Sequence, residues 1–283
     1  MKTKTIAFHK LSGSGNDFIL IDNRRGALKG VQLNRFAAAI CRHRMSVGGD
    51  GLILFEKPRA KGAAFRWRLF NADGSEAEMS GNGGRCAARL AWLLGIAPKR
   101  MRFETLAGTV QAEITGRGGT QVKIEMPPPH GLQLDLKVPF DGEARVGHFL
   151  NTGVPHFVYL LEDVSGIDVV GVGRRTRQHP AFQPAGTNVN FAKITGRHTI
   201  AMRTYERGVE DETLACGTGA TATALVAGVL GRVQSPVTLR QPSGLDLKVH
   251  FAWDGQRFSA VFLEGDARVV YRGDLWTEAW KRS

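Results

Sequence analysis

The stretch MSGNG at residues 79–83 recurs as ACGTG at residues 215–219, and this pair decides how the sequence folds. Each stretch is followed by a run rich in alanine and leucine. The run ends at a glycine that stands 15 residues after Ser80 in the first case and 15 residues after Cys216 in the second. An internal repeat constrains the whole fold, so the sequence predicts two similar units.

Matching segments also lie upstream of the two stretches. A glycine-containing turn leads into an apolar strand at residues 14–20 and again at residues 153–159. The run Pro127–Pro129 separates the halves, because proline interrupts regular structure. We therefore expect an N-terminal half formed by residues 1–127 plus 265–283 and a C-terminal half formed by residues 128–264.

Each half is expected to combine short strands with one enclosed helix. Strand-forming residues dominate 121–126 and 260–263, between segments rich in glycine and proline. The segments Arg85–Leu94 and Ala220–Leu230 are apolar nearly all round, which indicates helices covered by other structure. A glycine follows each of them and is a natural helix terminator. The predicted fold class is α/β (α+β), with two pseudo-symmetric domains.

A small side chain with a nucleophilic atom, Ser80 or Cys216, stands at the start of each predicted helix. Unpaired backbone N–H groups and the helix dipole favour an anion at such a place, and they lower the pKa of a thiol. If the halves face each other, the two helix starts can hold one carboxylate and place an acid and a base on opposite faces of the adjacent carbon. The alternative interpretation is a tight turn with no chemical role.

Composition limits the other possible functions. The formal charge of +12 is spread over scattered basic pairs, so we expect no nucleic-acid partner, and no apolar run is long enough for a membrane span. Three widely spaced cysteines form neither a disulfide framework nor a metal pair, which favours a soluble, cytoplasmic protein without metal. The segment Gly171–Thr176 lacks the third glycine of a dinucleotide loop, and we expect no cofactor.

Taken together, the motifs resemble those of the diaminopimelate epimerase family, and they occur in the family order over nearly the whole chain. They are GSGNDF (13–18), GGDG (48–51), NADGSE (71–76), SGNGGRC (80–86), PH (155–156), NVNF (188–191), YERG (205–208) and ETLACGTG (212–219). The resemblance implies two domains, each a curled mixed sheet around a central helix, with the active site at the domain interface. It also implies a two-base interconversion of L,L- and meso-diaminopimelate, without metal or pyridoxal, on the route to lysine and peptidoglycan.

The resemblance also assigns roles to individual residues. Cys216 is one catalytic thiol and Ser80 occupies the position of the other, while His156 and Glu206 tune these groups. Tyr271 matches a tyrosine at the family's dimer interface, so a homodimer is expected. The expected substrate contacts are Asn16, Asn71, Gly81, Asn82, Asn188, Glu206, Arg207, Gly217 and Thr218, with Arg207 as the clamp for the distal carboxylate.

Ser80 departs from the family, which has cysteine at this position. A hydroxyl does not form its anion at neutral pH without a base, so one acid/base group is impaired. Three explanations stay open: a functional serine served by His156 or another base, an engineered substitution, or a related reaction such as dehydration or epimerisation of another amino acid. A non-catalytic diamino-acid-binding protein is a further alternative. Cys86, about 9 Å along the helix from Ser80, is a poor replacement nucleophile.

Overall fold

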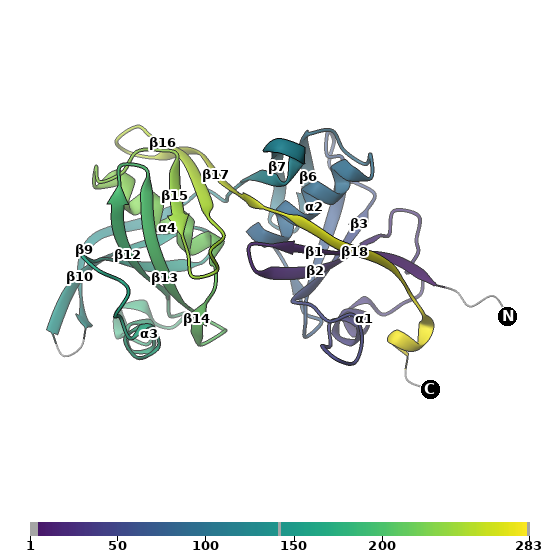
Figure 1. Cartoon of the computed structure of the whole chain (residues 1–283), viewed down its shortest axis with the longest axis horizontal. Coiled ribbons are helices and arrows are strands. Elements are labelled where there is room, and N and C mark those ends of the chain that lie inside the picture. The colour runs from purple at the N-terminus through teal and green to yellow at the C-terminus, as the bar shows by residue number, and fades with distance from the viewer. Residues whose placement is uncertain (1–4, 141–142, 282–283) are drawn as a thin grey trace. The chain divides into compact units, whose positions relative to one another are not determined.

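The computed structural model describes residues 5–140 and 143–281. It consists of two compact units, with residues 1–124 and 265–283 in unit 1 and residues 125–264 in unit 2 (Figure 1). The chain passes between the units at two points, and both lie inside strands. These strands are β8 (Gln121–Glu125) and β17 (Phe258–Asp266).

Unit 1 is a mixed sheet with two helices. The helices are α1 (Leu33–Ile40) and α2 (Gly81–Leu93). The further strands are β1 (Ile6–Gly13), β2 (Asn16–Asp22), β3 (Gly51–Glu56), β4 (Phe65–Asn71), β5 (Glu76–Ala77), β6 (Arg100–Thr105), β7 (Gly108–Thr115) and β18 (Arg268–Leu275). Pairing runs β18–β1–β2–β3–β4–β6–β7–β8, with β5 also on β4; the β2–β3 and β4–β6 pairs are parallel and the others antiparallel.

Unit 2 repeats this plan. Its helices are α3 (Val169–Arg177) and α4 (Gly217–Val229). The strands are β9 (His130–Phe140), β10 (Glu143–Asn151), β11 (Pro155–Leu160), β12 (Asn188–Gly196), β13 (Thr199–Glu206), β14 (Asp211–Thr213), β15 (Val237–Arg240), β16 (Leu247–Trp253) and β17. Pairing runs β9–β10–β11–β12–β13–β15–β16–β17, with β14 also on β13 and with β11–β12 and β13–β15 parallel. The same strand directions recur at every step, which confirms the predicted pseudo-symmetric pair of mixed units.

The two central helices begin where the sequence predicted, directly after Ser80 and Cys216. They start at Gly81 and Gly217, ahead of the apolar segments that begin at Arg85 and Ala220, because the residue before each glycine acts as the N-cap. Both helices are buried along most of their length, as their apolar composition predicted. In unit 2, α4 contacts strands β10, β11, β12, β13, β15 and β16, so the sheet curls around it.

Aromatic side chains form part of the core of each unit. In unit 1, Phe65 stacks on Phe103 with ring centroids 5.0 Å apart, beside Gly84 of α2. In unit 2, Tyr159 stacks on Phe191 at 5.7 Å, and both rings are fully buried in the cluster that packs against α3. No helix in the described part of the chain is long and apolar enough to cross a membrane.

Candidate functional site

Ser80 caps the start of α2. Its backbone is extended, with φ −147° and ψ 124°, and its Oγ accepts a hydrogen bond of 3.2 Å from the backbone N–H of Gly83. Gly81 is the first helical residue. The N–H groups of this first turn have no partner within the helix itself, which makes the start of α2 suitable for an anion.

Asn82, in the first turn of α2, belongs to a chain of polar contacts. Its Nδ2 donates to Oδ1 of Asn16 at 2.7 Å, and Nδ2 of Asn16 donates to Oδ2 of Asp50 at 2.9 Å. At the other end, Nη2 of Arg85 donates to Oδ1 of Asn82 at 2.8 Å. The structure therefore brings together two of the predicted substrate residues of unit 1, Asn16 and Asn82.

Arg85 is the charged residue at the centre of this polar cluster, and its side chain is fully buried. Its Nη2 also donates to Oγ of Ser14 at 2.8 Å, and Ser14 in turn donates to a carboxylate oxygen of Asp266. Burial lowers the pKa of Arg85 to about 10, so the guanidinium remains charged at neutral pH. Arg85 lies inside the SGNGGRC motif, but nothing in the motif itself predicted this structural role.

Asn71 lies apart from these contacts. It ends β4 and forms a tight turn, in which its Nδ2 donates to Oγ of Ser75 at 2.9 Å. Its backbone also pairs with Ser75, at 2.8 Å from N to O. The side chain is exposed, and these contacts are those of a turn-forming asparagine.

Cys216 caps α4 in the way that Ser80 caps α2. Its Sγ accepts from the backbone N–H of Gly219 at 3.4 Å and lies 3.5 Å from Oγ1 of Thr218. Gly217 is the first residue of the helix. A Cβ added at Gly219 would overlap Oδ1 of Asn190, so glycine is required for this helix start to rest on β12.

The acidity of Cys216 differs from the prediction. Burial, and after it the carboxylate of Glu206, raise the pKa of the thiol to about 12, although the donors at Thr218 and Gly219 act in the opposite direction. The expected lowering was wrong because desolvation of the thiolate outweighs the helix start. Burial also raises the pKa of Glu206, whose side chain lies beside Cys216.

Asn188 and Arg207 form a second predicted group in unit 2. Oδ1 of Asn188 accepts from the backbone N–H of Arg207 at 2.9 Å, and its Nδ2 donates to the carbonyl of Pro155 at 2.8 Å. Nη1 of Arg207 donates to the carbonyl of Ala185 at 2.9 Å. Asn188 therefore fixes the backbone of Arg207, and the carbonyl of Ala185, in the loop before β12, fixes its guanidinium.

His156 is fully buried on β11. Its Nδ1 lies 3.2 Å from Nδ2 of Asn190, while Oδ1 of Asn190 accepts from the hydroxyl of Thr204 at 3.0 Å. The asparagine therefore presents a donor to Nδ1, which leaves the hydrogen of the neutral ring on Nε2. Within residues 5–140 and 143–281, Nε2 has no hydrogen-bond partner. Burial, and then the charge of Arg207, lower the pKa of His156 to about 3.

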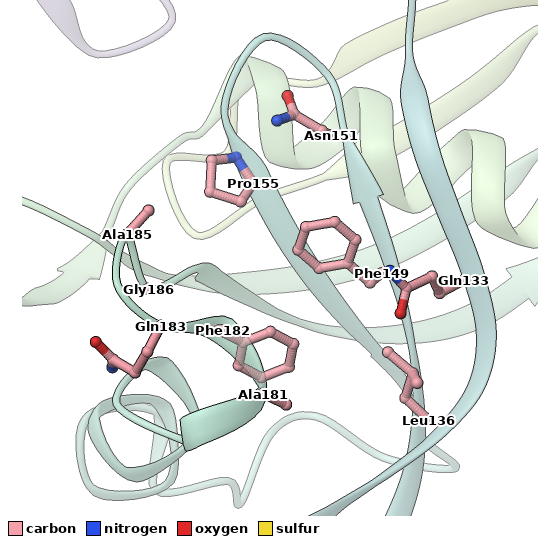
Figure 2. A pocket seen from close by; sticks show the side chains of 10 residues that line it. All are labelled: Gln133, Leu136, Phe149, Asn151, Pro155, Ala181, Phe182, Gln183, Ala185 and Gly186. Carbon is pink, nitrogen blue, oxygen red and sulfur yellow. The ribbon is translucent and has the colours of Figure 1, made fainter.

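A pocket of about 360 Å³ lies beside the group formed by Asn188 and Arg207 (Figure 2). The rings of Phe149 and Phe182 line it, together with the side chains of Gln133 and Asn151. Its wall includes Pro155 and Ala185, whose carbonyls hold the predicted site residues. None of the predicted site side chains lines the pocket itself.

Tyr271 lies on β18 and is 45% exposed. Its ring packs edge to face against Phe8, with centroids 5.8 Å apart. The neighbouring Val270 is 58% exposed, so an apolar strip covers part of this strand. Among the described residues there is no cluster of three or more side chains from histidine, cysteine, aspartate or glutamate that could hold a metal ion.

Solved structures of racemases and isomerases share this fold. A hydroxyproline epimerase from Agrobacterium vitis superimposes with a TM-score of 0.68 at 14% identity, covering 97% of this chain and 93% of that chain. A methylitaconate delta-isomerase superimposes with a TM-score of 0.70 at 12% identity, covering 100% and 98%. At these identities the likeness shows the fold alone, and this chain has the fold of these solved structures.

Sequence comparison identifies the family. A model of diaminopimelate epimerase matches residues 8–131 and 148–270. The diaminopimelate epimerase of Aquifex aeolicus (strain VF5) is 46% identical over 278 residues, which cover 96% of this chain and 98% of that protein. The one from Hydrogenobaculum sp. (strain Y04AAS1) is 45% identical over 275 residues, with 94% and 97% covered. The chain belongs to the diaminopimelate epimerase family and is an isomerase.

Proposed function

We propose that this chain interconverts L,L- and meso-diaminopimelate by moving the α-proton, and that each unit supplies one acid/base group. The observation that carries the proposal is the matched capping of the two central helices. Ser80 and Cys216 each accept a hydrogen bond from the backbone N–H three residues later. Inversion requires an acid and a base on opposite faces of the carbon, and a duplicated helix start supplies two such groups.

In this proposal the helix starts also bind the reacting carboxylate. Gly81 and Asn82 in unit 1, and Gly217 and Thr218 in unit 2, lie in first turns whose N–H groups favour an anion. Removal of the α-proton places a second negative charge on the carboxylate. Preorganised donors stabilise that charge without having to reorganise during the reaction.

The distal end of the substrate is assigned to the other polar residues. Arg207 is the proposed clamp for the distal carboxylate, since a guanidinium pairs with both oxygens at once. Its backbone is held by Asn188. Asn16, Asn71, Asn188 and Glu206 are the further proposed substrate contacts, and the distal group would exclude amino acids that lack it.

Glu206 is the proposed base for the thiol of Cys216. The two side chains are in contact, and burial raises the pKa of Glu206, which makes this carboxylate a better proton acceptor. The proton passes from Sγ to the carboxylate, and the thiolate then removes the α-proton from one stereoisomer. Ser80 is the proposed proton donor on the other face, and its tuning partner is His156.

Ser80 favours a second candidate, in which the chain exchanges the α-proton on one face with slow inversion. A hydroxyl is a much weaker acid than a thiol. The serine at position 80 would also be consistent with a related reaction on another amino acid. Both candidates keep Cys216 as the working acid/base group and differ in whether Ser80 can supply the second proton. The rate of inversion relative to the rate of α-proton exchange therefore separates them.

The test is incubation of L,L- and meso-diaminopimelate with the protein in deuterated water, followed by NMR. We expect one isomer to lose its α-hydrogen through Cys216 while inversion is slow. Ser80→Cys should increase inversion by about 10²-fold or more, because a positioned acid/base group contributes at least that much. Cys86→Ala is the matched control in α2, since Cys86 is fully buried and burial raises the pKa of its thiol to about 12.

Two outcomes would contradict the proposal. The first is that neither isomer exchanges and the Ser80→Cys variant is equally inactive. The second is tight binding of diaminopimelate without exchange in either variant, which would indicate a non-catalytic binding protein. Exchange that persists in Cys216→Ala would move the reaction to other groups.

We also propose that the protein acts as a homodimer in the cytoplasm. The exposed strip around Tyr271 on β18 supports an interface there. Cys41, Cys86 and Cys216 are free thiols, which supports a reducing compartment.

A further inference from the structure

The backbone of Cys216 is held by the side chain of a residue 25 positions later. The N–H of Cys216 donates to Oε1 of Gln241 at 2.7 Å, in a buried contact. Gln241 directly follows β15 and opens a turn, in which the N–H of Ser243 donates to the carbonyl of Leu214 at 3.1 Å. Two hydrogen bonds, one at Leu214 and one at Cys216, therefore join the segment that carries the thiol to this turn.

The contact fixes the orientation of the Gln241 amide. A backbone N–H can only donate, so Oε1 must face Cys216 and Nε2 must point elsewhere. Gln241 is 8% exposed, and its Nε2 is buried with no hydrogen-bond partner in the part of the chain that the structure describes. A buried donor without a partner is costly, so the bond from Cys216 to Oε1 holds the amide in this orientation.

The repeat provides a natural comparison, because Thr105 stands 25 residues after Ser80. Its hydroxyl donates to the carbonyl of Gly108 at 2.8 Å, within its own turn. Gly108 and Gly244 both have positive φ, 111° and 70°, so the two turns correspond. Gln241 in unit 2 and Thr105 in unit 1 thus occupy corresponding positions. Gln241 bonds to the start of α4, whereas Thr105 bonds within its own turn.

We propose that Gln241 is a positioning residue for Cys216. Its Oε1 fixes the backbone that carries the thiol, and with it the position of Sγ relative to the donors at Thr218 and Gly219. The inference rests on the proposed role of Cys216. Glu206, from β13, is the carboxyl group in contact with the same thiol, and it raises the pKa of the thiol only while it is ionised.

The test measures the thiol directly and does not need catalysis. The rate of alkylation of Cys216 by iodoacetamide is followed between pH 7 and pH 11, with peptide mass spectrometry to separate Cys216 from Cys41 and Cys86. Gln241→Met keeps the length of the side chain and removes both polar atoms. We expect alkylation about fivefold to tenfold slower at pH 9, with the profile displaced to higher pH.

Two further variants make the result specific. Gln241→Glu keeps the acceptor, loses the donor and adds charge, so it should displace the profile further than Gln241→Met. Thr105→Val, at the corresponding position of unit 1, should leave the profile unchanged. If Gln241→Met does not fold, Gln241→Thr, with the residue found at the counterpart position, takes its place.

A profile of Gln241→Met or Gln241→Thr that superimposes on that of the parent protein would overturn the proposal. If the parent protein exchanges an α-hydrogen, kcat for that exchange should fall about tenfold in Gln241→Met, with KM unchanged. Absence of exchange in the parent protein would count against the proposed function alone. The alkylation profile would still decide the role of Gln241.

Discussion

The side-chain amide of Asn82 donates to Oδ1 of Asn16 across 2.7 Å, and this contact has only one possible direction. Arg85, which can only donate, occupies Oδ1 of Asn82. Asp50, which only accepts when ionised, takes the hydrogen bond from Nδ2 of Asn16. The donor at one end and the acceptor at the other fix the orientation of both amides, so the substrate would meet them already ordered.

Asp50→Asn should therefore weaken binding. A neutral amide at position 50 still accepts from the backbone N–H of Asp17, but the hydrogen bond that it accepts from Nδ2 of Asn16 is weaker than one to a carboxylate, so Asn16 and Asn82 are held less firmly. We expect the Kd for meso-diaminopimelate, measured by calorimetry, to rise about tenfold, the equivalent of one hydrogen bond. Asp254→Asn, in an exposed turn of unit 2, is the matched control. Equal Kd values in both variants would remove Asp50 from the site.

Arg85→Met should lower the free energy of unfolding. The change removes the buried cation that donates to Oδ1 of Asn82, Oγ of Ser14 and the backbone carbonyl of Asp266, and we expect a loss of about 3 kcal/mol. Urea unfolding at pH 7.5 measures it. Arg100→Met removes an ion pair with Glu113 from a side chain that is 85% exposed, and should cost about 0.5 kcal/mol or less. A similar loss in both variants would show that the buried cluster does not contribute as described.

His156 should make the protein less stable in acid. Its pKa of about 3 lies below the ordinary histidine value of 6.5, so on acidification the unfolded chain takes up this proton before the folded protein does. The contribution of His156 to stability is complete above about pH 6.5 and is lost as the pH falls toward 3. Between pH 7 and pH 5, the parent protein should lose about 2 kcal/mol more than His156→Gln.

The measurement is urea unfolding of both proteins at the two pH values, so that the effect of the substitution itself cancels. His130→Gln is the control, because His130 is exposed on β9. The same pH dependence in the parent protein and in His156→Gln would mean that the pKa of His156 is the same in the folded and the unfolded protein.

The sequence predicted the features that depend on local spacing. The repeat of MSGNG and ACGTG placed Ser80 and Cys216 at the starts of two enclosed helices, and the composition of these helices predicted their burial. Gly95 and Gly231 end the helices with φ of 66° and 68°, as expected of C-terminal glycines.

Features that depend on tertiary burial could not be predicted in this way. The pKa of Cys216 is set by its enclosure and by Glu206, which contacts it from another strand, and neither is visible in the motif. The pairing of Asn16 with Asn82 joins residues 66 positions apart. The contact of Gln241 with Cys216 spans 25 residues, and the repeat does not predict it, because the counterpart Thr105 bonds within its own turn.

The exposed strip on β18 should be the dimer contact. Val270 is 58% exposed and Tyr271 45%, on a strand whose residues 268–272 are all exposed. Such a strand would leave an apolar patch in water unless a second copy covers it. Val270→Arg places a charge in the strip without disturbing the core. In sedimentation velocity at about 10 μM, we expect the parent protein at twice the chain mass of 30.8 kDa and the variant at the chain mass. Val146→Arg, on exposed β10, is the control and should remain dimeric. A parent protein that sediments as a monomer, or a Val270→Arg variant that stays dimeric, would place the interface elsewhere or remove it.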